Sequence, residues 1–386
     1  MIDLCPVCTQ SSLQDILTVT NVPVHQNLLY DTRNDALNTR RGTIQLAICA
    51  HCGFVTNRTF DLSLLDYSEK YENTQNFSNY FQAYVNALVA HLIDSHELVE
   101  KTIVEIGCGK GDFIKALVAQ NDNVGFGFDP SYLGDLHLYD GRLTFIQDFY
   151  DGRYREYRAD LYTSRHVIEH IPEPLAHIQV IRESIGDRQA SVFFETPDVS
   201  WIFQHAAFWD LAYEHCSLFS PDSMRHLLQL GGFKHIDVVP AFGDQYMWTE
   251  AKSAAEITLT PHERVERLVQ SALAFGKQFS EVKYVWRQKI DVLLNQGKQV
   301  AIWGAGAKGV NFLNMLEFTS DAISHVVDVN PRKQGKYIAG TGQQIILPSQ
   351  LSQHKPDTVV IMNPNYQDEI RTQLADIAPE AQVIVL

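Results

Sequence analysis

A glycine-rich stretch that directly follows a short apolar run is the feature that most constrains the fold of this chain. The run covers residues 103–106 and contains one acidic residue, Glu105. Three glycines follow at alternate positions: Gly107, Gly109 and Gly111. Residues 113–118 then repeat apolar side chains at helical spacing. Because glycine lets a ligand approach the backbone, the pattern predicts a buried parallel strand, a tight turn and a helix whose N-terminus faces a ligand.

Two further strand patterns end in carboxylates. Residues 124–129 form a second apolar run with Asp129 at its end, and residues 143–148 repeat the pattern with Asp148 at the tip. An acid at the tip of the second strand can hold a ribose diol through both oxygens. The acid of the third strand is placed to accept a hydrogen bond from an exocyclic amine. A fourth strand begins at residues 159–162.

The loop and the two acids, taken in this order, resemble a class I S-adenosylmethionine-dependent methyltransferase. The resemblance rests on the E/DxGxGxG pattern that begins at Glu105 and on the two strand-tip acids. It implies an α/β fold with a Rossmann-like core and S-adenosylmethionine as the cofactor. The implied cofactor-binding residues are Glu105, Gly107, Gly109, Gly111, Asp129 and Asp148.

Two histidines follow the fourth strand, His166 and His170. They are four residues apart, so they would share one face if this segment is helical. A metal site is poorly supported, because Glu169 is misplaced for an HExxH motif. A histidine in this loop more often faces the cofactor or the substrate, and we assign His166 to the cofactor.

Length and charge limit the classes of protein that the chain can form. At 386 residues it is too long for one ordinary core, so two or three domains are expected. No apolar run approaches the roughly 20 residues that span a membrane, and no charged-then-apolar leader opens the sequence, so we expect a cytoplasmic monomer or homodimer without a membrane partner. The net charge of −15 argues against a nucleic-acid partner, although a local cationic pocket could still bind phosphate.

Four of the six cysteines form two Cys-x-x-Cys pairs: Cys5, Cys8, Cys49 and Cys52. Two such pairs about forty residues apart are typical of a structural zinc site. Disulfides are the alternative, and the lack of a secretory leader argues against them. Four thiolates fill the coordination sphere of a tetrahedral ion, so the zinc is predicted to be structural and not catalytic.

The patterns divide the chain into four segments. A zinc-binding lobe is expected at residues 1–60, and a methyltransferase core at residues 61–252. A helical connector covers residues 253–296, where an apolar stripe follows a capping box at Thr260–Glu263. A C-terminal Rossmann-like domain is expected at residues 297–386.

A polar, tyrosine-rich stretch precedes the core at residues 67–80 and includes Tyr67 and Tyr71. One interpretation is a solvated loop. The other is a lid that carries substrate contacts, and the sequence favours neither.

Aromatic and titratable residues meet at Tyr213, Glu214 and His215, shortly before a predicted helix capped by Ser220. Imidazole is the side chain whose ordinary pKa suits proton abstraction near neutrality. A neighbouring carboxylate could fix its tautomer and stabilise the imidazolium. The alternative is that His215 is a hydrogen-bonded core residue.

The last ninety residues restart the α/β pattern. A strand at residues 299–303 is followed by the glycine loop Gly304-Ala-Gly306-Ala-Lys308-Gly309, and a second strand ends at Asp328. Three interpretations stay open: a bound nicotinamide cofactor, a phosphate-bearing ligand that meets Lys308, or a packing turn without a ligand. The remaining length leaves room for half a Rossmann unit only.

The order of zinc knuckles, methyltransferase core and GAGAKG unit resembles the sugar C-methyltransferases that act on nucleotide-linked keto-deoxysugars. The most specific features are the EHxxxFS run from Glu214 to Ser220, the paired cysteine motifs and the C-terminal loop. The resemblance implies that His215 removes a proton beside a ketone and that the enolate carbon is methylated. It places Glu214 beside this base and adds His170 and Tyr71 to the active site. It also implies that the C-terminal domain holds the nucleotide through residues such as Gly304, Gly306 and Lys308.

The sequence departs from that family at one informative position. Ala212 stands where its best-known members carry an active-site tyrosine, and Tyr213 is displaced by one residue. Tyr71, Tyr213 or His170 could stabilise the enolate oxygen. The rival functions are an O- or N-methyltransferase, an enzyme that binds a nicotinamide cofactor as well, and a non-catalytic binding protein.

Overall fold

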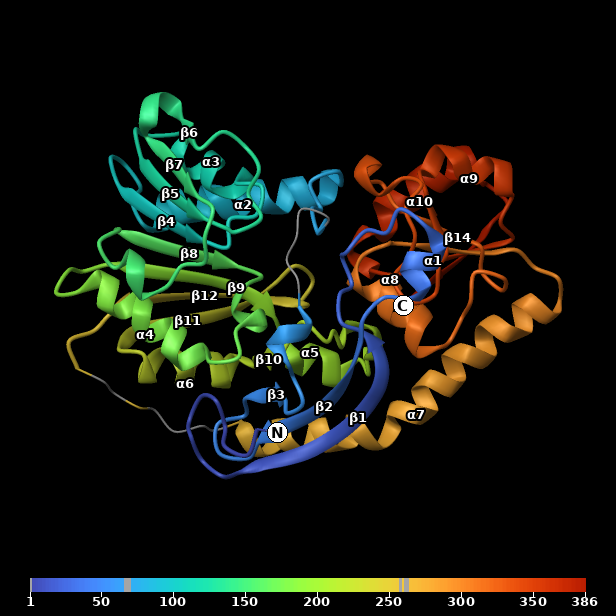
Figure 1. Cartoon of the computed structure of the whole chain (residues 1–386), viewed down its shortest axis with the longest axis horizontal. Helices are drawn as coiled ribbons and strands as arrows, with labels where there is room; N and C mark the ends of the chain where they lie inside the picture. Colours follow the sequence, from blue (N-terminus) through green and yellow to red (C-terminus); the bar gives the residue numbers. More distant parts are fainter. Residues whose placement is uncertain (1, 66–70, 257–258, 260–263) are drawn as a thin grey trace.

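The computed structural model describes residues 2–65, 71–256, 259 and 264–386, and Thr260–Glu263 and Tyr67 therefore lie outside the described residues. Within that part of the chain three sheets follow one another, with four, eight and five strands (Figure 1). None of the described helices is long and apolar enough to cross a bilayer.

The eight-stranded sheet is the centre of the molecule and has the order β11-β12-β9-β8-β4-β5-β7-β6. The five parallel strands are β4 (Thr102–Ile106), β5 (Val124–Phe128), β7 (Leu143–Ile146), β8 (Leu161–Arg165) and β9 (Ser191–Pro197). The antiparallel strands are β6 (His137–Leu138), β11 (Phe233–Ala241) and β12 (Tyr246–Ser253). The predicted Rossmann-like α/β fold of a class I methyltransferase is confirmed.

The strand order reverses between β4 and β8, because the chain first builds outward through β5 and β7 and then returns to β8. Ligands of such sheets bind at the carboxyl ends of the strands at this reversal. Helices that pack on the sheet are α2 (Asn79–Ser95), α3 (Asp112–Val118), α4 (Pro174–Ile185) and α6 (Pro221–Leu230), whereas α5 (Val199–Gln204) packs against the long helix of residues 265–295. The short 3-10 turns of this part are η1 (Leu62–Leu64), η2 (Tyr139–Gly141), η3 (Gly152–Tyr154), η4 (Ile168–His170) and η5 (Phe208–Asp210).

The N-terminal sheet is not built from the N-terminal residues alone. Its order is β1-β2-β3-β10, in which β10 (Ser217–Leu218) comes from the centre of the chain. The other members are β1 (Leu13–Pro23), β2 (Arg41–Cys49) and β3 (Val55–Asn57), with helix α1 (Arg33–Leu37) between the first two. Strand β10 pairs with β3 through Ser217 and Thr56, so the lobe is joined by a strand to the residues around His215.

The C-terminal domain follows the long helix α7 (Val265–Asn295), which spans the molecule from the N-terminal lobe to the last domain (Figure 1). Its parallel sheet has the order β15-β14-β13-β16-β17. The strands are β13 (Val300–Trp303), β14 (His325–Val327), β15 (Gln344–Ile346), β16 (Thr358–Ile361) and β17 (Gln382–Val385). The helices are α8 (Ala307–Met315), α9 (Pro348–His354) and α10 (Gln367–Ile377), with 3-10 turns η6 (Pro331–Lys333) and η7 (Pro364–Tyr366). Five strands exceed the half Rossmann unit that the length suggested, because these strands are short.

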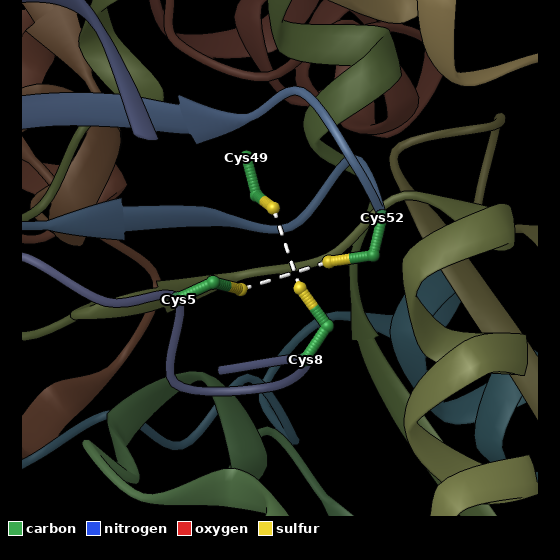
Figure 2. Close-up of side chains that lie close together, drawn as sticks. All are labelled: Cys5, Cys8, Cys49 and Cys52. Carbon is green, nitrogen blue, oxygen red and sulfur yellow. Dashed lines mark hydrogen bonds between the residues drawn. The ribbon is translucent and has the colours of Figure 1, made fainter. Parts of the chain in front are cut away.

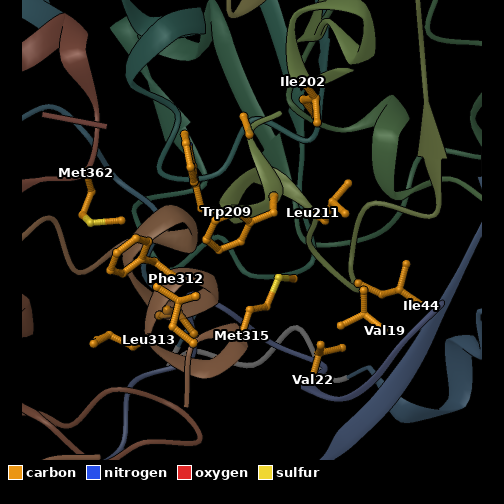
Figure 3. Packing of buried hydrophobic residues seen from close by; sticks show 14 of the residues in the cluster. Val19, Val22, Ile44, Ile202, Trp209, Leu211, Phe312, Leu313, Met315 and Met362 are labelled. Carbon is orange, nitrogen blue, oxygen red and sulfur yellow. The ribbon is translucent and has the colours of Figure 1, made fainter. Parts of the chain in front are cut away.

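One hydrophobic cluster joins the N-terminal sheet and the C-terminal domain to the segment that follows β9 in the central domain. Figure 3 shows apolar side chains from all three parts meeting between the sheets. Its labelled members are Val19, Val22, Ile44, Ile202, Trp209, Leu211, Phe312, Leu313, Met315 and Met362. Because each part buries its apolar face against the others, the cavity between them has fixed walls.

Candidate active site

The first glycine loop has the left-handed backbone that its sequence predicts. Gly107, Gly109 and Gly111 have φ values of +72°, +55° and +76°. A Cβ on Gly107 would lie 2.2 Å from Val167 Cγ2, whereas nothing lies within 4 Å of one on Gly109. The loop is thus closely packed on one side and open on the other, as a ligand-binding turn requires.

Replacing Gly107 by alanine is expected to weaken S-adenosylmethionine binding and to lower the melting temperature. The added Cβ meets Val167 and sits in a backbone conformation that costs about 1–3 kcal/mol. Differential scanning fluorimetry and calorimetric titration with S-adenosylhomocysteine measure the two effects. Gly297→Ala is the matched control, since Gly297 has φ +75° but no neighbour within 4 Å. Equal losses of stability in both variants would contradict the packing role of Gly107.

Two predicted acids hold the loop itself. Glu105 Oε2 accepts a hydrogen bond from Ile114 N at 3.0 Å, and burial raises the pKa of Glu105 to about 8. Asp129 accepts from Gly109 N at 2.8 Å and from Ser131 N at 2.8 Å. Glu105 therefore holds the first turn of α3, and Asp129 holds the backbone of the glycine turn.

Asp148 has partners other than the loop. Its Oδ2 accepts from Tyr154 Oη at 2.7 Å and is paired with Arg153 at 2.8 Å, and these two partners lower the pKa of Asp148. In this structure the predicted adenine contact is occupied by a tyrosine and an arginine.

A cavity of about 600 Å³ lies between the central sheet and the C-terminal sheet. It brings together most of the residues that the sequence singled out. The predicted residues on its wall are Tyr71, Glu105, Gly107, Gly109, His166, His170, His215, Gly304, Gly306 and Lys308. Of the predicted set, Gly111, Asp129, Asp148, Tyr213 and Glu214 do not line this cavity among the described residues.

His215 and His170 form a pair on the cavity wall. Their ring centroids are 4.9 Å apart and their planes are perpendicular. Burial, with a smaller contribution from His170, lowers the pKa of His215 to about 4. The imidazole of His215 is therefore neutral at neutral pH and has a lone pair that can accept a proton.

Glu169 supplies the carboxylate beside this pair. Ligand-forming atoms of Glu169, His170 and His215 all lie within 4.8 Å of one another. A set of two histidines and a glutamate could hold a metal ion, but Glu169 already accepts from Thr196 Oγ1 at 3.0 Å and lies 3.5 Å from His166 Nδ1. These partners favour a proton-transfer site over a metal site.

His166 is held between two carboxylates. Its Nδ1 is 3.5 Å from Glu169 and its Nε2 is 3.4 Å from Glu195. Burial would lower the pKa of His166, but Glu195 and Glu169 raise it to about 9. Glu195 is also paired with Arg165 at 2.6 Å. The result is a buried charge network between the glycine loop and the histidine pair.

Glu214, predicted to lie beside the base, contacts the N-terminal lobe and does not line the cavity among the described residues. Its Oε1 accepts from Gln26 N at 2.9 Å, and its Oε2 is 3.4 Å from His25 Nδ1. The ring of His25 lies 6.2 Å from that of Tyr71. Glu214 thus joins the N-terminal lobe to the cavity through His25.

Tyr213 is also directed away from the cavity, so the structure does not support its predicted contact with an enolate. Its hydroxyl accepts a hydrogen bond from Asp61 N at 2.9 Å, and its ring packs against Phe60. A Cβ on Gly42 would lie 2.4 Å from Tyr213 Cε2, so the ring fills the space above this glycine.

Side-chain hydrogen bonds join the described part of the tyrosine-rich stretch to the C-terminal domain. Glu72 accepts from Asn330 Nδ2 at 3.2 Å, and Gln75 accepts from Tyr366 Oη at 2.6 Å. Ser78 donates to Glu369 at 2.6 Å. This segment lines the cavity, as the lid interpretation predicts and the solvated-loop interpretation does not.

In the second glycine loop, after β13, one glycine is closely packed and another faces open space. Gly309 is a packing glycine, because a Cβ there would lie 2.0 Å from Gly304 O. Gly306 faces open space, with only Asn27 Oδ1 at 4.0 Å. Lys308 forms an ion pair with Asp210 of η5, so its charge is shared with the central domain.

Asp328, at the tip of β14, holds this loop as Asp129 holds the first one. Its Oδ2 accepts from Ala305 N at 2.9 Å and is 3.2 Å from Lys333 Nζ. These contacts occupy the carboxylate that a nicotinamide cofactor would need for its ribose.

The four cysteines of the paired motifs converge at one point of the N-terminal lobe (Figure 2). The Cys5 and Cys52 sulfurs are 3.6 Å apart, and those of Cys8 and Cys49 are 3.5 Å apart. These distances are far longer than a disulfide bond and close to the roughly 3.8 Å between ligand sulfurs of a tetrahedral zinc ion. The donor set therefore fits zinc.

Sequence reasoning missed several residues of the site. Arg165, Glu195, Tyr246 and Asn27 line the cavity or complete its charge network, and Glu169 was noted only for its misplacement. Arg165 and Glu195 lie at strand ends next to the predicted ligand-binding edge, which is a signal that could have found them. Asn27 comes from the N-terminal lobe, and nothing local in the sequence indicates it.

Comparison with known proteins adds two domain matches. Residues 78–238 match a family model described as a methyltransferase domain, and residues 249–386 match one described as the C-methyltransferase C-terminal domain. With the fold and the cavity, these matches define the chain as an S-adenosylmethionine-dependent methyltransferase. The match of the last domain is to a model of C-methyltransferases, which supports carbon as the methylated atom.

A curated relative matches the chain along nearly its whole length. C-methyltransferase NovU of Streptomyces niveus is 24% identical over 405 residues, which cover 96% of this chain and 91% of the relative. Two solved structures also resemble the chain. Magnesium protoporphyrin IX methyltransferase of Synechocystis PCC 6803 has a TM-score of 0.36 and 17% identity, with 45% of this chain and 84% of that chain covered. The CurJ carbon methyltransferase has a TM-score of 0.34 and 13% identity, with 46% and 56% covered.

Proposed function

We propose that the protein is a C-methyltransferase that acts on a nucleotide-linked keto-deoxysugar through an enolate. The observation that carries the proposal is the single cavity in which the glycine loop after β4, the neutral His215 and the glycine loop after β13 all meet. A substrate with a sugar at one end and a nucleotide at the other matches a cavity shared by two domains.

In this mechanism His215 accepts a proton from the carbon beside the ketone and becomes an imidazolium. His170 or Tyr71, both on the cavity wall, donates a hydrogen bond to the oxygen on which negative charge develops. S-adenosylmethionine, when bound, supplies the electrophilic methyl group that the enolate carbon takes. Glu105, Gly107, Gly109 and His166 would hold this cofactor, with Asp129 fixing the loop and Asp148 and Gly111 at its margin.

The nucleotide would lie at the C-terminal side, near Gly304, Gly306 and Lys308. A nicotinamide cofactor is less well supported there, because Asp328 is occupied by Lys333 and Ala305 N. The proposal includes a structural zinc ion on the four cysteines, a small-molecule partner only, a cytoplasmic location, and a monomer or homodimer.

Hydrogen exchange in deuterium oxide tests the proposal most directly. The protein, with S-adenosylhomocysteine present, is mixed with a panel of nucleotide-linked keto sugars, and uptake of deuterium beside the ketone is followed by mass spectrometry. We expect enzyme-dependent exchange on one sugar. The same sugar should be methylated on carbon when S-adenosylmethionine replaces S-adenosylhomocysteine. Methylation of oxygen or nitrogen without exchange would show that the rival function is correct.

The pH dependence of kcat/KM is expected to be flat from pH 7.5 down to pH 5. Because the folded protein depresses the pKa of His215 to about 4, the base form is present above that pH and is lost only as the pH falls through it. About nine-tenths of the activity should remain at pH 5, where a histidine with its ordinary pKa of about 6.5 would retain only a few per cent. Initial rates across this range, with the melting temperature recorded at each pH, make the measurement. An acidic limb centred near pH 6.5 would contradict the role assigned to His215.

A further inference from the structure

We propose that Glu169 is the residue that positions the base His215, a role for which the sequence favours Glu214. This inference rests on the proposed function and deepens it by naming the carboxylate on which enolisation depends. Glu169 lies in η4, one residue before His170, and lines the cavity. Glu214 is adjacent to His215 in sequence, but its carboxylate accepts from Gln26 N and lies 3.4 Å from His25 Nδ1, both in the N-terminal lobe.

The carboxylate of Glu169 lies close to both histidines of the cavity wall. Its carboxylate and the ring nitrogens of His170 and His215 lie within 4.8 Å of one another. The two imidazole rings meet edge to face, so the carboxylate can face the nitrogens of each. All three residues lie on the wall of the cavity, so a substrate that enters it can reach His215 with the carboxylate close by.

Glu169 is itself held firmly from three directions. Thr196 Oγ1, on β9, donates to its Oε2 at 3.0 Å, and His166 Nδ1 lies 3.5 Å from its Oε1. Cys216 Sγ, next to His215, donates to its backbone oxygen at 3.8 Å. With only 2% of its surface exposed, Glu169 cannot change rotamer without breaking the contacts with Thr196 and His166. Rigid support of this kind is what a positioning carboxylate needs.

The negative charge of Glu169 favours the protonated form of His215 and so helps this histidine to accept a proton. Burial and His170 both disfavour protonation of His215, and the negative charge of Glu169, within 4.8 Å, acts in the opposite direction, with a smaller contribution from Glu214. When His215 takes the proton from carbon, Glu169 stabilises the imidazolium that forms. Removing this charge should slow proton abstraction and leave cofactor binding intact.

Glu169→Gln tests the inference, because it keeps the shape of the side chain and removes its charge. Exchange of the substrate proton and kcat are expected to fall by about 100-fold, with the dissociation constant of S-adenosylhomocysteine and the melting temperature close to wild type. Glu169→Asp, which keeps the charge but shortens the side chain, is expected to retain part of the rate.

Glu250→Gln is the matched control. Glu250 also contacts two histidines, His91 at 2.6 Å and His96 at 2.7 Å, but it lies outside the cavity. This variant should change stability and leave exchange unaltered. Exchange by Glu169→Gln within about 3-fold of wild type would overturn the inference, and so would loss of S-adenosylhomocysteine binding together with the activity.

A readout without substrate separates this inference from the proposed function. Imidazole ¹⁵N shifts of His170 and His215, assigned with the variants His170→Ala and His215→Ala, should change in Glu169→Gln and stay unchanged in Glu250→Gln. Unchanged shifts in Glu169→Gln would overturn the positioning role whether or not a sugar is found. If the shifts change but no sugar of the panel exchanges, the positioning role stands and the proposed substrate is wrong.

Discussion

His215→Ala is expected to lower both hydrogen exchange and methyl transfer by at least about 1,000-fold. A positioned general base contributes roughly 10²–10⁴-fold, and the other histidines of the described cavity have other assigned roles: His166 lies between two carboxylates that raise its pKa, and His170 is assigned to the enolate oxygen. The binding of S-adenosylhomocysteine should change little, because the loop that would hold it is fixed by Glu105 and Asp129. Calorimetric titration and exchange mass spectrometry on the same preparation measure the two properties.

His137→Ala is the control for this experiment. His137 is an exposed histidine on the edge strand β6, and its ring contacts only Thr144 in the described structure. Its removal should leave exchange and methylation at the wild-type level. If His215→Ala kept more than about a tenth of the wild-type exchange, the base would have to be another group. His215 would then be a structural residue.

Cys49→Ser is expected to remove the metal and to destabilise the whole protein. Structural zinc contributes on the order of 10 kcal/mol to small metal-bound folds, so one lost thiolate should lower the melting temperature by about 10 °C or more. Cys5, Cys49 and Cys52 also pack in a core cluster with Phe219 and Met224 of the methyltransferase core. Loss of the metal should therefore not be confined to the N-terminal lobe.

Metal content and activity are both readouts of this variant. Elemental analysis should give about one zinc per wild-type chain and well below one in Cys49→Ser. Activity should fall as well, because β3 follows the second cysteine pair and pairs with β10, two residues after His215. Cys108→Ser is the control for metal content, since Cys108 is a thiol outside the cluster. A zinc-free Cys49→Ser variant with a wild-type melting temperature would contradict the structural role.

Local patterns were sufficient to predict the strands, the glycine turns and the convergence of the cysteine pairs. A glycine turn after a buried strand has few alternative conformations. Two Cys-x-x-Cys pairs in one small lobe predict a shared metal site. The meeting of His170, His215 and the C-terminal loop was expected only from the resemblance to the sugar C-methyltransferases, because these residues belong to different sheets and no local pattern joins them.

The directions of neighbouring side chains could not be predicted in the same way. Tyr213, Glu214 and His215 are consecutive, yet Tyr213 contacts Asp61, Glu214 contacts His25 and only His215 reaches the cavity. The partners of the first two lie more than 150 positions away in sequence. The pairing of Lys308 with Asp210 is equally remote, so its effect on the charge available to a phosphate is visible only in the folded chain.

Strand β10, which comes from the centre of the chain but completes the N-terminal sheet, affects the order in which this sheet can form during synthesis. A protein synthesised from its N-terminus exposes β1, β2 and β3 about 160 residues before Ser217 and Leu218 emerge to complete their sheet. Until then β3 presents an unpaired edge, which is the kind of surface that pairs wrongly with other chains. Early capture of zinc by the cysteine pairs would hold this edge in place during the delay. Metal supply during synthesis should therefore affect the yield of soluble protein more than it affects protein that has already folded.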